Sequence, residues 1–202
     1  MELVIEHGQV VAPPGEIFGW FDWEELYDRA VESAPPGSAL VELGVFFGCS
    51  LAYLARKAKD ANKGLRVYGV DTWKGSPEFD GSVWVNDMPI NDTGPGFLLG
   101  SCYANLAERG LANDVILIVS DSADAASLFK DEAVHMVFVD AAHDEAGVAR
   151  DIAAWRSRVK PGGIMAGHDY RESDGFPGVK AAVDAAFGDA VKGVGSWWEV
   201  QF

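Results

Sequence analysis

Cysteine is scarce in this sequence of 202 residues, which contains only Cys49 and Cys102. Two thiols provide no disulfide framework, and this favours a reducing, cytoplasmic setting. No apolar run reaches the roughly 18 residues that a membrane-spanning helix needs, so we expect no membrane partner. The first ten residues include acidic but no basic side chains, and we therefore expect no secretory signal there.

Positive charge is also scarce, with 16 Lys and Arg against 31 Asp and Glu and a formal net charge of −15. Binding to a phosphate backbone needs clustered Lys and Arg, and the nearest approach to a cluster is residues 55–59. We therefore expect no nucleic-acid partner. The acidity is typical of a soluble protein, and it also fits carboxylates that face a cation.

The chain alternates short apolar runs with helical patterns. Apolar residues recur at helical spacing over 51–58 and 148–159, and the KPGG stretch at 160–163 is expected to end the second helix. The runs that suit buried strands are 39–45, 65–71, 115–121, 135–141 and 163–170. This alternation predicts an α/β fold with a parallel sheet and helices on both faces.

Three other regions stand outside this alternation. Residues 191–202 contain two short strand-like runs around a Gly-Ser pair, which predicts a hairpin and an antiparallel last strand. Residues 1–37 include a helix near 16–33, and we expect them to form an N-terminal helical extension of a domain at 38–202. Residues 73–96 are rich in Gly, Pro, Asp and Asn, and this long loop is a candidate substrate lid that carries Trp84.

Each predicted parallel strand brings an acid to the same edge of the sheet. In an open parallel sheet, ligands bind beyond the carboxyl ends of the strands. A single Asp there is explained as a helix cap or a turn residue, but five acids at one edge favour a binding site. They are Glu42 within the first run, and Asp71, Asp121, Asp140 and Asp169 at the ends of the following four.

The turn after the first strand predicts a nucleoside site rather than a dinucleotide site. Gly44 and Gly48 allow close approach of the backbone, and the helix that follows offers free N–H groups. The third glycine of a dinucleotide fingerprint is missing, because residue 51 is Leu. Asp71 is placed to accept hydrogen bonds from a ribose diol, whereas the SDS run at 120–122 either contacts an adenine amine or caps a helix. An acidic rim suits a nucleoside that carries a positive charge.

Together these motifs resemble the class I S-adenosylmethionine-dependent methyltransferases over most of residues 38–202. The DTWKGSP stretch at 71–77 resembles the macrocin-type sugar O-methyltransferases. The FVDAAHD and AGHDY stretches resemble that group and the catechol-type O-methyltransferases. The resemblance implies a Rossmann-like, doubly wound sheet of seven strands with the last one antiparallel. It also implies methyl transfer to a hydroxyl group of a small molecule, namely a sugar, a phenol or a natural product.

The resemblance also implies roles for individual residues. His143, three residues after Asp140, corresponds to a general base, and Asp140 and Asp169 correspond to metal ligands, with His168 as a further candidate. Oxygen ligands suit Mg²⁺, whereas an imidazole suits Mn, Fe or Zn, and a metal-free enzyme stays open. The residues implied to bind S-adenosylmethionine are Glu42, Gly44, Phe47, Gly48, Ser50, Asp71, Thr72, Trp73, Asp121, Ser122 and Asp140.

Other functions compete with methyl transfer. His143, His168 and Asp140 also fit a two-histidine, one-carboxylate iron site, as in a hydroxylase of the cephalosporin hydroxylase-like type. A non-catalytic nucleoside-binding module is a further alternative. An NAD-dependent oxidoreductase is also considered, but the missing third glycine argues against it. The N-terminal 37 residues either cover the site or form a contact in a homo-oligomer.

Overall fold

The computed structural model describes residues 16–76, 95–171 and 175–202. It also describes the backbone of two short antiparallel hairpins, formed by β1 (Val4–Glu6) with β2 (Gln9–Val11) and by β5 (Trp84–Val85) with β6 (Met88–Pro89). Most of the loop predicted at 73–96, including the side chain of Trp84, lies outside the described residues.

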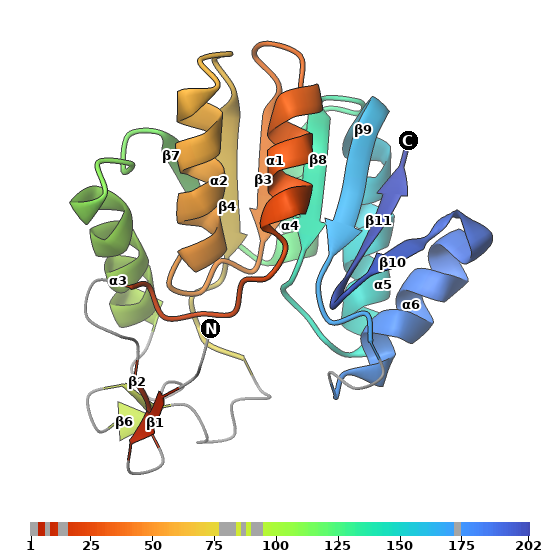
Figure 1. Ribbon diagram of the computed structural model, residues 1–202. Helices are drawn as coiled ribbons and strands as arrows, with labels where there is room; N and C mark the ends of the chain where they lie inside the picture. Colours follow the sequence, from red (N-terminus) through yellow and green to blue (C-terminus); the bar gives the residue numbers. More distant parts are fainter. Residues whose placement is uncertain are drawn as a thin grey trace.

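A seven-stranded sheet forms the centre of the molecule (Figure 1). The strand order is β10-β11-β9-β8-β3-β4-β7, in which β7, β4, β3, β8 and β9 are parallel and β11 is antiparallel to both of its neighbours. The strands are β3 (Ala39–Leu43), β4 (Arg66–Asp71), β7 (Val115–Val119), β8 (Val134–Val139), β9 (Val159–Gly167), β10 (Lys192–Val194) and β11 (Trp197–Gln201). The predicted fold class and the antiparallel last strand are confirmed.

Helices cover both faces of this sheet, as predicted (Figure 1). The helices are α1 (Glu24–Ser33), α2 (Cys49–Asp60), α3 (Pro95–Glu108), α4 (Ser122–Ala125), α5 (Glu145–Trp155) and α6 (Pro177–Phe187). Leu40 and Trp197 pack in one core with α1, α2 and α3, whereas their neighbours Val41 and Trp198 pack in a second core with α4, α5 and α6. Adjacent strand residues therefore serve opposite faces. No described helix combines the length and apolar character needed to cross a lipid bilayer.

Two predicted boundaries were wrong. Helix α1 begins at Glu24 rather than near residue 16, because residues 16–23 pack as a non-helical aromatic segment in which Trp23 is buried. Helix α5 ends at Trp155, so the KPGG stretch does not end it. That stretch lies inside β9, where Gly163 is so close to β8 that a Cβ atom would lie 2.7 Å from the carbonyl oxygen of His135.

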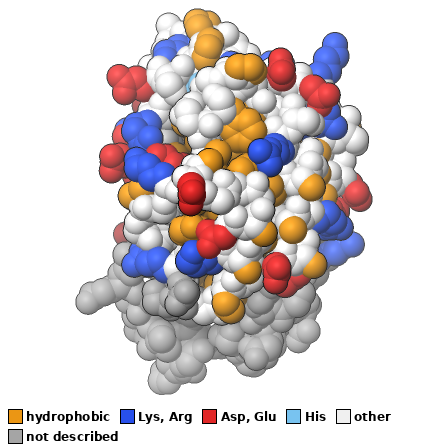
Figure 2. Space-filling model, turned by 90° about the vertical axis from the view of Figure 1, so that its right-hand side faces the viewer, with side chains coloured by type: hydrophobic (Ala, Val, Ile, Leu, Met, Phe, Trp, Pro, Cys, Tyr) orange, Lys and Arg blue, Asp and Glu red, His pale blue; other side chains and the backbone are white. Residues whose placement is uncertain are grey.

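The surface beside α6 and the β10–β11 hairpin carries charges of both signs (Figure 2). Lys192 and Arg29 both pair with Glu199, at 3.0 and 2.6 Å, and Lys180 pairs with Asp184 at 2.5 Å. Blue and red side chains are interspersed over the described part of this face, without a continuous basic stripe. This face therefore gives no support to nucleic-acid binding.

Candidate active site at the carboxyl edge of the sheet

A cavity of about 720 Å³ opens at the carboxyl ends of the parallel strands. Much of its wall consists of residues at the ends of β3, β4, β7, β8 and β9 and in the turns that follow them, namely residues 44–46, 71–73, 120–122, 140–143 and 168–169. Among the described residues that line it, five carboxylates stand against two guanidinium groups. They are Asp22, Asp71, Asp121, Asp140 and Asp169 against Arg150 and Arg171. The imidazoles of His143 and His168 also line the cavity, and the carboxylates still outnumber the basic groups, so the cavity suits a positively charged ligand.

Gly44 permits close contact between the ends of β3 and β8. Its φ is +84°, and a Cβ atom at this position would lie 1.9 Å from the carbonyl oxygen of Asp140. The N–H of Asp140 donates to the carbonyl oxygen of Leu43 at 2.9 Å, which ties the two strand ends together. A side chain at residue 44 would force these two walls of the cavity apart.

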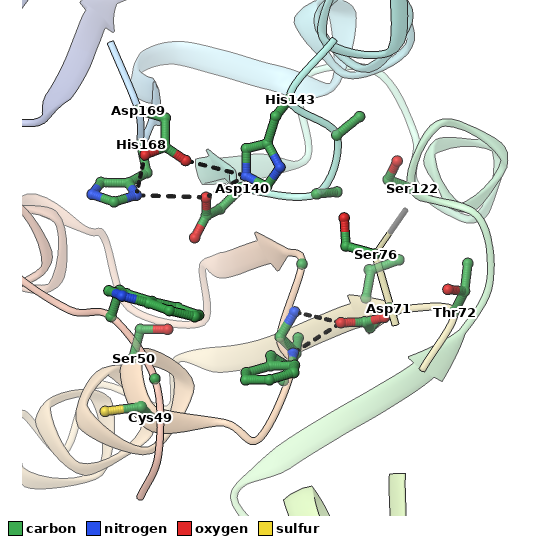
Figure 3. Close-up of a pocket in the computed structure, with 18 of the residues that line it drawn as sticks. Cys49, Ser50, Asp71, Thr72, Ser76, Ser122, Asp140, His143, His168 and Asp169 are labelled. Atoms are coloured by element: carbon green, nitrogen blue, oxygen red, sulfur yellow. Dashed lines mark hydrogen bonds and ion pairs between the residues drawn. The ribbon is translucent and has the colours of Figure 1, made fainter. Parts of the chain in front are cut away.

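Asp71 organises the turn after β3. Its Oδ2 accepts hydrogen bonds from the N–H groups of Val45 and Phe46 at 2.8 and 2.9 Å, and its Oδ1 accepts one from the N–H of Trp73 at 2.7 Å (Figure 3). A carboxylate has about four acceptor positions, so about one is left for a ligand. The predicted bond from Asp71 to a ribose diol stays a prediction.

Asp121 caps helix α4, which is one of the two roles considered for the SDS run. Its Oδ1 accepts hydrogen bonds from the N–H groups of Ala123 and Asp124, and its Oδ2 accepts one from Arg150 at 2.7 Å. The hydroxyl of Ser122 donates to the buried Asp151 at 2.5 Å. Asp121 and Ser122 both line the cavity, so a contact with adenine stays compatible with the cap.

Asp140, His143 and Asp169 form a compact cluster at the ends of β8 and β9 (Figure 3). The Nε2 atom of His143 lies 3.1 Å from Asp169 Oδ2 and 3.8 Å from Asp140 Oδ1. One donor atom from each of the three residues lies within 4.8 Å of the other two, which is close enough to hold one metal ion. Asp169 has a φ of +58°, which is strained for a residue with a side chain and common at functional sites.

His168 lies next to this cluster but is not one of its three residues. Its Nδ1 atom lies 3.3 Å from Asp169 Oδ1 and 3.8 Å from Asp140 Oδ1, and its Nε2 atom lies 3.6 Å from Asp22 Oδ1. The imidazole therefore stands between carboxylates of the cluster and a carboxylate of the N-terminal segment.

The cluster stabilises positive charge. Burial by itself would lower the pKa of His143, but the adjacent carboxylates of Asp140 and Asp169 outweigh this effect and raise it to about 10. Burial raises the pKa of Asp140. Burial would also raise the pKa of Asp169, yet the imidazoles of His143 and His168 hold it well below its usual range. A cation between the two carboxylates therefore fits the charge of the site.

Three residues expected to contact the donor do not line the cavity, namely Glu42, Phe47 and Gly48. Glu42 is fully buried and accepts hydrogen bonds from the hydroxyls of Tyr27 at 2.6 Å and Ser50 at 2.9 Å. It therefore joins α1 and the start of α2 to β3. The other expected donor-binding residues do line it, namely Gly44, Ser50, Asp71, Thr72, Trp73, Asp121, Ser122 and Asp140.

Several residues that line the cavity were not singled out from the sequence, although coverage of the site by the N-terminal residues was one of the two alternatives considered. Residues 18–22 form part of its wall, and Trp20 stacks on Phe46 with ring centroids 6.3 Å apart. Phe176 stacks on His143 with centroids 4.4 Å apart. The only sequence signal for these N-terminal residues was their high content of aromatic side chains. Because a helix was predicted there, these side chains were not assigned to the site.

Comparison with known families identifies the chain. A protein-family model described as a methyltransferase domain matches residues 41–170, and the chain therefore belongs to the methyltransferase-domain family. Family and fold together make it a class I S-adenosylmethionine-dependent methyltransferase, as the sequence predicted. No curated protein matches the chain.

Solved structures of methyltransferases share the fold at low sequence identity. The O-methyltransferase NovP is 19% identical with a TM-score of 0.66, over 88% of this chain and 78% of NovP. The calicheamicin methyltransferase CalS11 is 17% identical with a TM-score of 0.63, over 89% and 77%. TomG of Streptomyces achromogenes, an O-methyltransferase of tomaymycin synthesis solved in complex with SAM, is 18% identical with a TM-score of 0.59, over 89% and 78%.

Proposed function

We propose that this methyltransferase acts on a hydroxyl group of a small molecule, with a divalent cation held by Asp140 and Asp169 and with His143 as the general base. The observation that carries the proposal is the close approach of Asp140, His143 and Asp169 at one end of the cavity. This approach supports a cation site and a proton acceptor beside the cavity that would hold the methyl donor.

The cavity suits S-adenosylmethionine in size and in charge. Its volume of about 720 Å³ lies within the range of roughly 300–1,000 Å³ typical of small-molecule sites. S-adenosylmethionine supplies an electrophilic methyl group on a positively charged sulfonium. Gly44 leaves room along the cavity wall, Asp71 and Asp121 offer acceptors for the nucleoside, and the acidic lining attracts the cation.

The cation site uses ligands that a hard divalent ion prefers. Carboxylates completed by waters are typical of Mg²⁺, and Mn²⁺ accepts the same donors. A divalent cation there would supply Lewis acidity toward the acceptor hydroxyl. Asp140 and Asp169 follow neighbouring parallel strands, β8 and β9, and their carboxylates meet through His143 and His168. Asp140 and Asp169 would thus hold the cation at the end of the cavity where the acceptor hydroxyl would bind.

His143 would take the proton of the acceptor once a cation is bound. Without a cation, and against the lowering effect of burial, Asp140 and Asp169 raise the pKa of His143 to about 10 and keep its ring protonated. A cation between the two carboxylates would offset their charge, lower this pKa and leave the ring free to accept a proton. Its Nε2 atom faces the two carboxylates at 3.1 and 3.8 Å, and its ring is held by the stack on Phe176. A positioned general base contributes roughly 10²–10⁴-fold to rate, and proximity of an in-line nucleophile contributes the rest.

The composition of the cluster favours a transferase over the iron-dependent hydroxylase. The three residues that could hold an ion are one histidine and two carboxylates, whereas that class of iron site has two histidines and one carboxylate. The names of the solved relatives, among them a TDP-rhamnose 3′-O-methyltransferase, favour a sugar or a natural-product scaffold as acceptor.

The variant His143→Ala tests the base. Formation of S-adenosylhomocysteine is measured with a panel of sugar nucleotides and phenols, and donor and Mn²⁺ affinities are measured by calorimetry. We expect turnover to fall roughly 10²–10⁴-fold, with both affinities within about twofold of wild type. Glu145→Gln, an exposed change at the start of α5, is the control. Unchanged turnover in His143→Ala would contradict the role of His143 as the general base. Loss of Mn²⁺ binding would indicate that His143 is a metal ligand instead.

A further inference from the structure

We propose that Asp22 is a positioning residue for the cation site, because it holds His168 in the orientation that keeps Asp169 and Asp140 together. The inference rests on the proposed function, since it concerns the same cation. It assigns a role to the N-terminal segment 16–23, which no sequence motif connects with the site.

Asp22 and His168 form the middle of a chain of polar contacts. The hydroxyl of Ser196 donates to Asp22 Oδ1 at 2.5 Å, and that oxygen lies 3.6 Å from His168 Nε2. The other ring nitrogen of His168 faces Asp169 Oδ1 at 3.3 Å and Asp140 Oδ1 at 3.8 Å. The imidazole of His168 therefore stands between the carboxylates of Asp22 and Asp169, and at 3.6 Å its contact with Asp22 is an ion-pair contact rather than a hydrogen bond.

The same segment fixes the plane of the His168 ring. Trp23, the residue after Asp22, packs on this ring with centroids 4.6 Å apart. Trp23 also stacks on Phe138 with centroids 4.7 Å apart and an interplanar angle of 22°. Phe138 belongs to β8, the strand that leads to Asp140. The ring therefore has little freedom to turn away from the two carboxylates.

Ser196, in the turn between β10 and β11, connects Asp22 to the residue that follows Asp169. Its carbonyl oxygen accepts a hydrogen bond from the N–H of Tyr170 at 2.9 Å, while its hydroxyl holds Asp22. Tyr170 follows Asp169, whose left-handed backbone persists only where the surroundings hold it. Asp22 is thus part of a set of contacts, through Ser196 and Tyr170, that determines where the Asp169 carboxylate lies.

Residues that hydrogen-bond to metal ligands influence how tightly the site binds its metal. Carboxylates that bind metals are themselves oriented by hydrogen bonds, and loss of such a partner typically lowers metal affinity roughly 10–100-fold. The side chain of Asp22 is 55% exposed, and exposed ion pairs contribute little to folding. Its replacement should therefore change the cation site without unfolding the protein.

The experiment is a titration of the full chain with Mn²⁺ alone, followed by electron paramagnetic resonance. We expect Asp22→Asn to weaken Mn²⁺ binding about tenfold or more. Glu25→Gln removes the same charge from an exposed position three residues away and should leave Mn²⁺ affinity within about twofold. Thermal melting of each variant checks that the fold is intact.

A double-mutant cycle separates positioning from general structural damage. Because Asp22 acts through His168, Asp22→Asn should have little further effect on Mn²⁺ binding in a His168→Ala background. His168→Asn, whose amide nitrogen reaches about as far as Nδ1, should retain more Mn²⁺ affinity than His168→Ala.

The outcomes are distinguishable. If wild type binds Mn²⁺ and Asp22→Asn binds it within twofold, the positioning role is wrong while the cation site stands. Additive losses in the double variant overturn the role in the same way. If wild type does not bind Mn²⁺, the cation site itself fails, and the role of Asp22 fails with it.

Discussion

Glu42→Gln should make the stability of the protein less sensitive to alkaline pH. Glu42 is fully buried on β3, where the hydroxyls of Tyr27 and Ser50 contact its carboxyl group. Burial raises the pKa of Glu42 from 4.5 to about 8, against the opposing effect of these hydrogen bonds. The folded protein therefore holds a proton on Glu42 at neutral pH that the unfolded chain has released.

The sign and size of the effect follow from this difference in pKa. Between pH 4.5 and about 8 the folded state binds more protons than the unfolded state, so stability is highest below pH 4.5 and is lost as pH rises towards 8. At about 1.36 kcal/mol for each pKa unit, the total loss is on the order of 5 kcal/mol. A glutamine side chain has nearly the same shape and cannot ionise, so this loss should disappear.

The free energy of unfolding is measured by urea titration with tryptophan fluorescence, since the chain contains seven tryptophans. Relative to their difference at pH 4, we expect Glu42→Gln to gain about 1 kcal/mol over wild type at pH 5.5 and a few kcal/mol more at pH 8.5. The control Glu25→Gln, at an exposed position, should follow wild type at all three pH values. A difference between wild type and Glu42→Gln that does not change with pH would refute the reasoning.

Two further predictions concern a glycine and a histidine. Gly44→Ala should destabilise the protein by about 3 kcal/mol or more through backbone strain and overpacking, since its Cβ would lie 1.9 Å from a carbonyl oxygen. Gly100→Ala, in α3 with open space around it, should stabilise the protein by about 0.5–1 kcal/mol, and urea titration of both variants checks the contrast. Burial and two nearby lysines lower the pKa of His135 from 6.5 to about 4, so its neutral form favours the folded state and stability is lost as pH falls from 6.5 towards 4. Unfolding curves at pH 7 and pH 5 should show a smaller loss in His135→Gln, and an equal loss would contradict this effect.

The strand ends of the site were predictable because apolar runs are clear signals. The run 65–71 ends at Asp71, and the run 135–141 contains Asp140 directly after four apolar residues. Both residues lie at the carboxyl edge of the sheet and line the cavity. Parallel strands require such runs to be buried on both faces, so the position of the first polar residue after each run could be read from the sequence.

Glu42 shows what the sequence does not determine. Every residue of β3 is buried, so the burial of a polar side chain in this strand depends on partners from other elements. The partners of Glu42 are Tyr27, from α1, and Ser50, from α2. No local pattern connects these three residues, and a contact with the donor was therefore expected instead.

The local structure of the N-terminal segment was predicted wrongly for a similar reason. Residues 16–23 contain enough apolar residues to fit a helix, but their aromatic side chains pack against Phe46, Tyr53 and Phe138. These are contacts between residues far apart in the sequence, and tertiary packing overrides local propensity in such cases. The placement of Asp22 beside His168 depends on this packing, and so it also lies beyond local sequence signals.

The most direct test of the account is a crystal structure of the protein grown with S-adenosylmethionine and Mn²⁺, with diffraction recorded at the manganese absorption edge. We predict density for the donor along Gly44, Asp71 and Asp121, with its sulfonium directed towards the cluster, and an anomalous peak between Asp140 and Asp169. Donor density at any other place, or an anomalous peak away from these two carboxylates, would contradict the account.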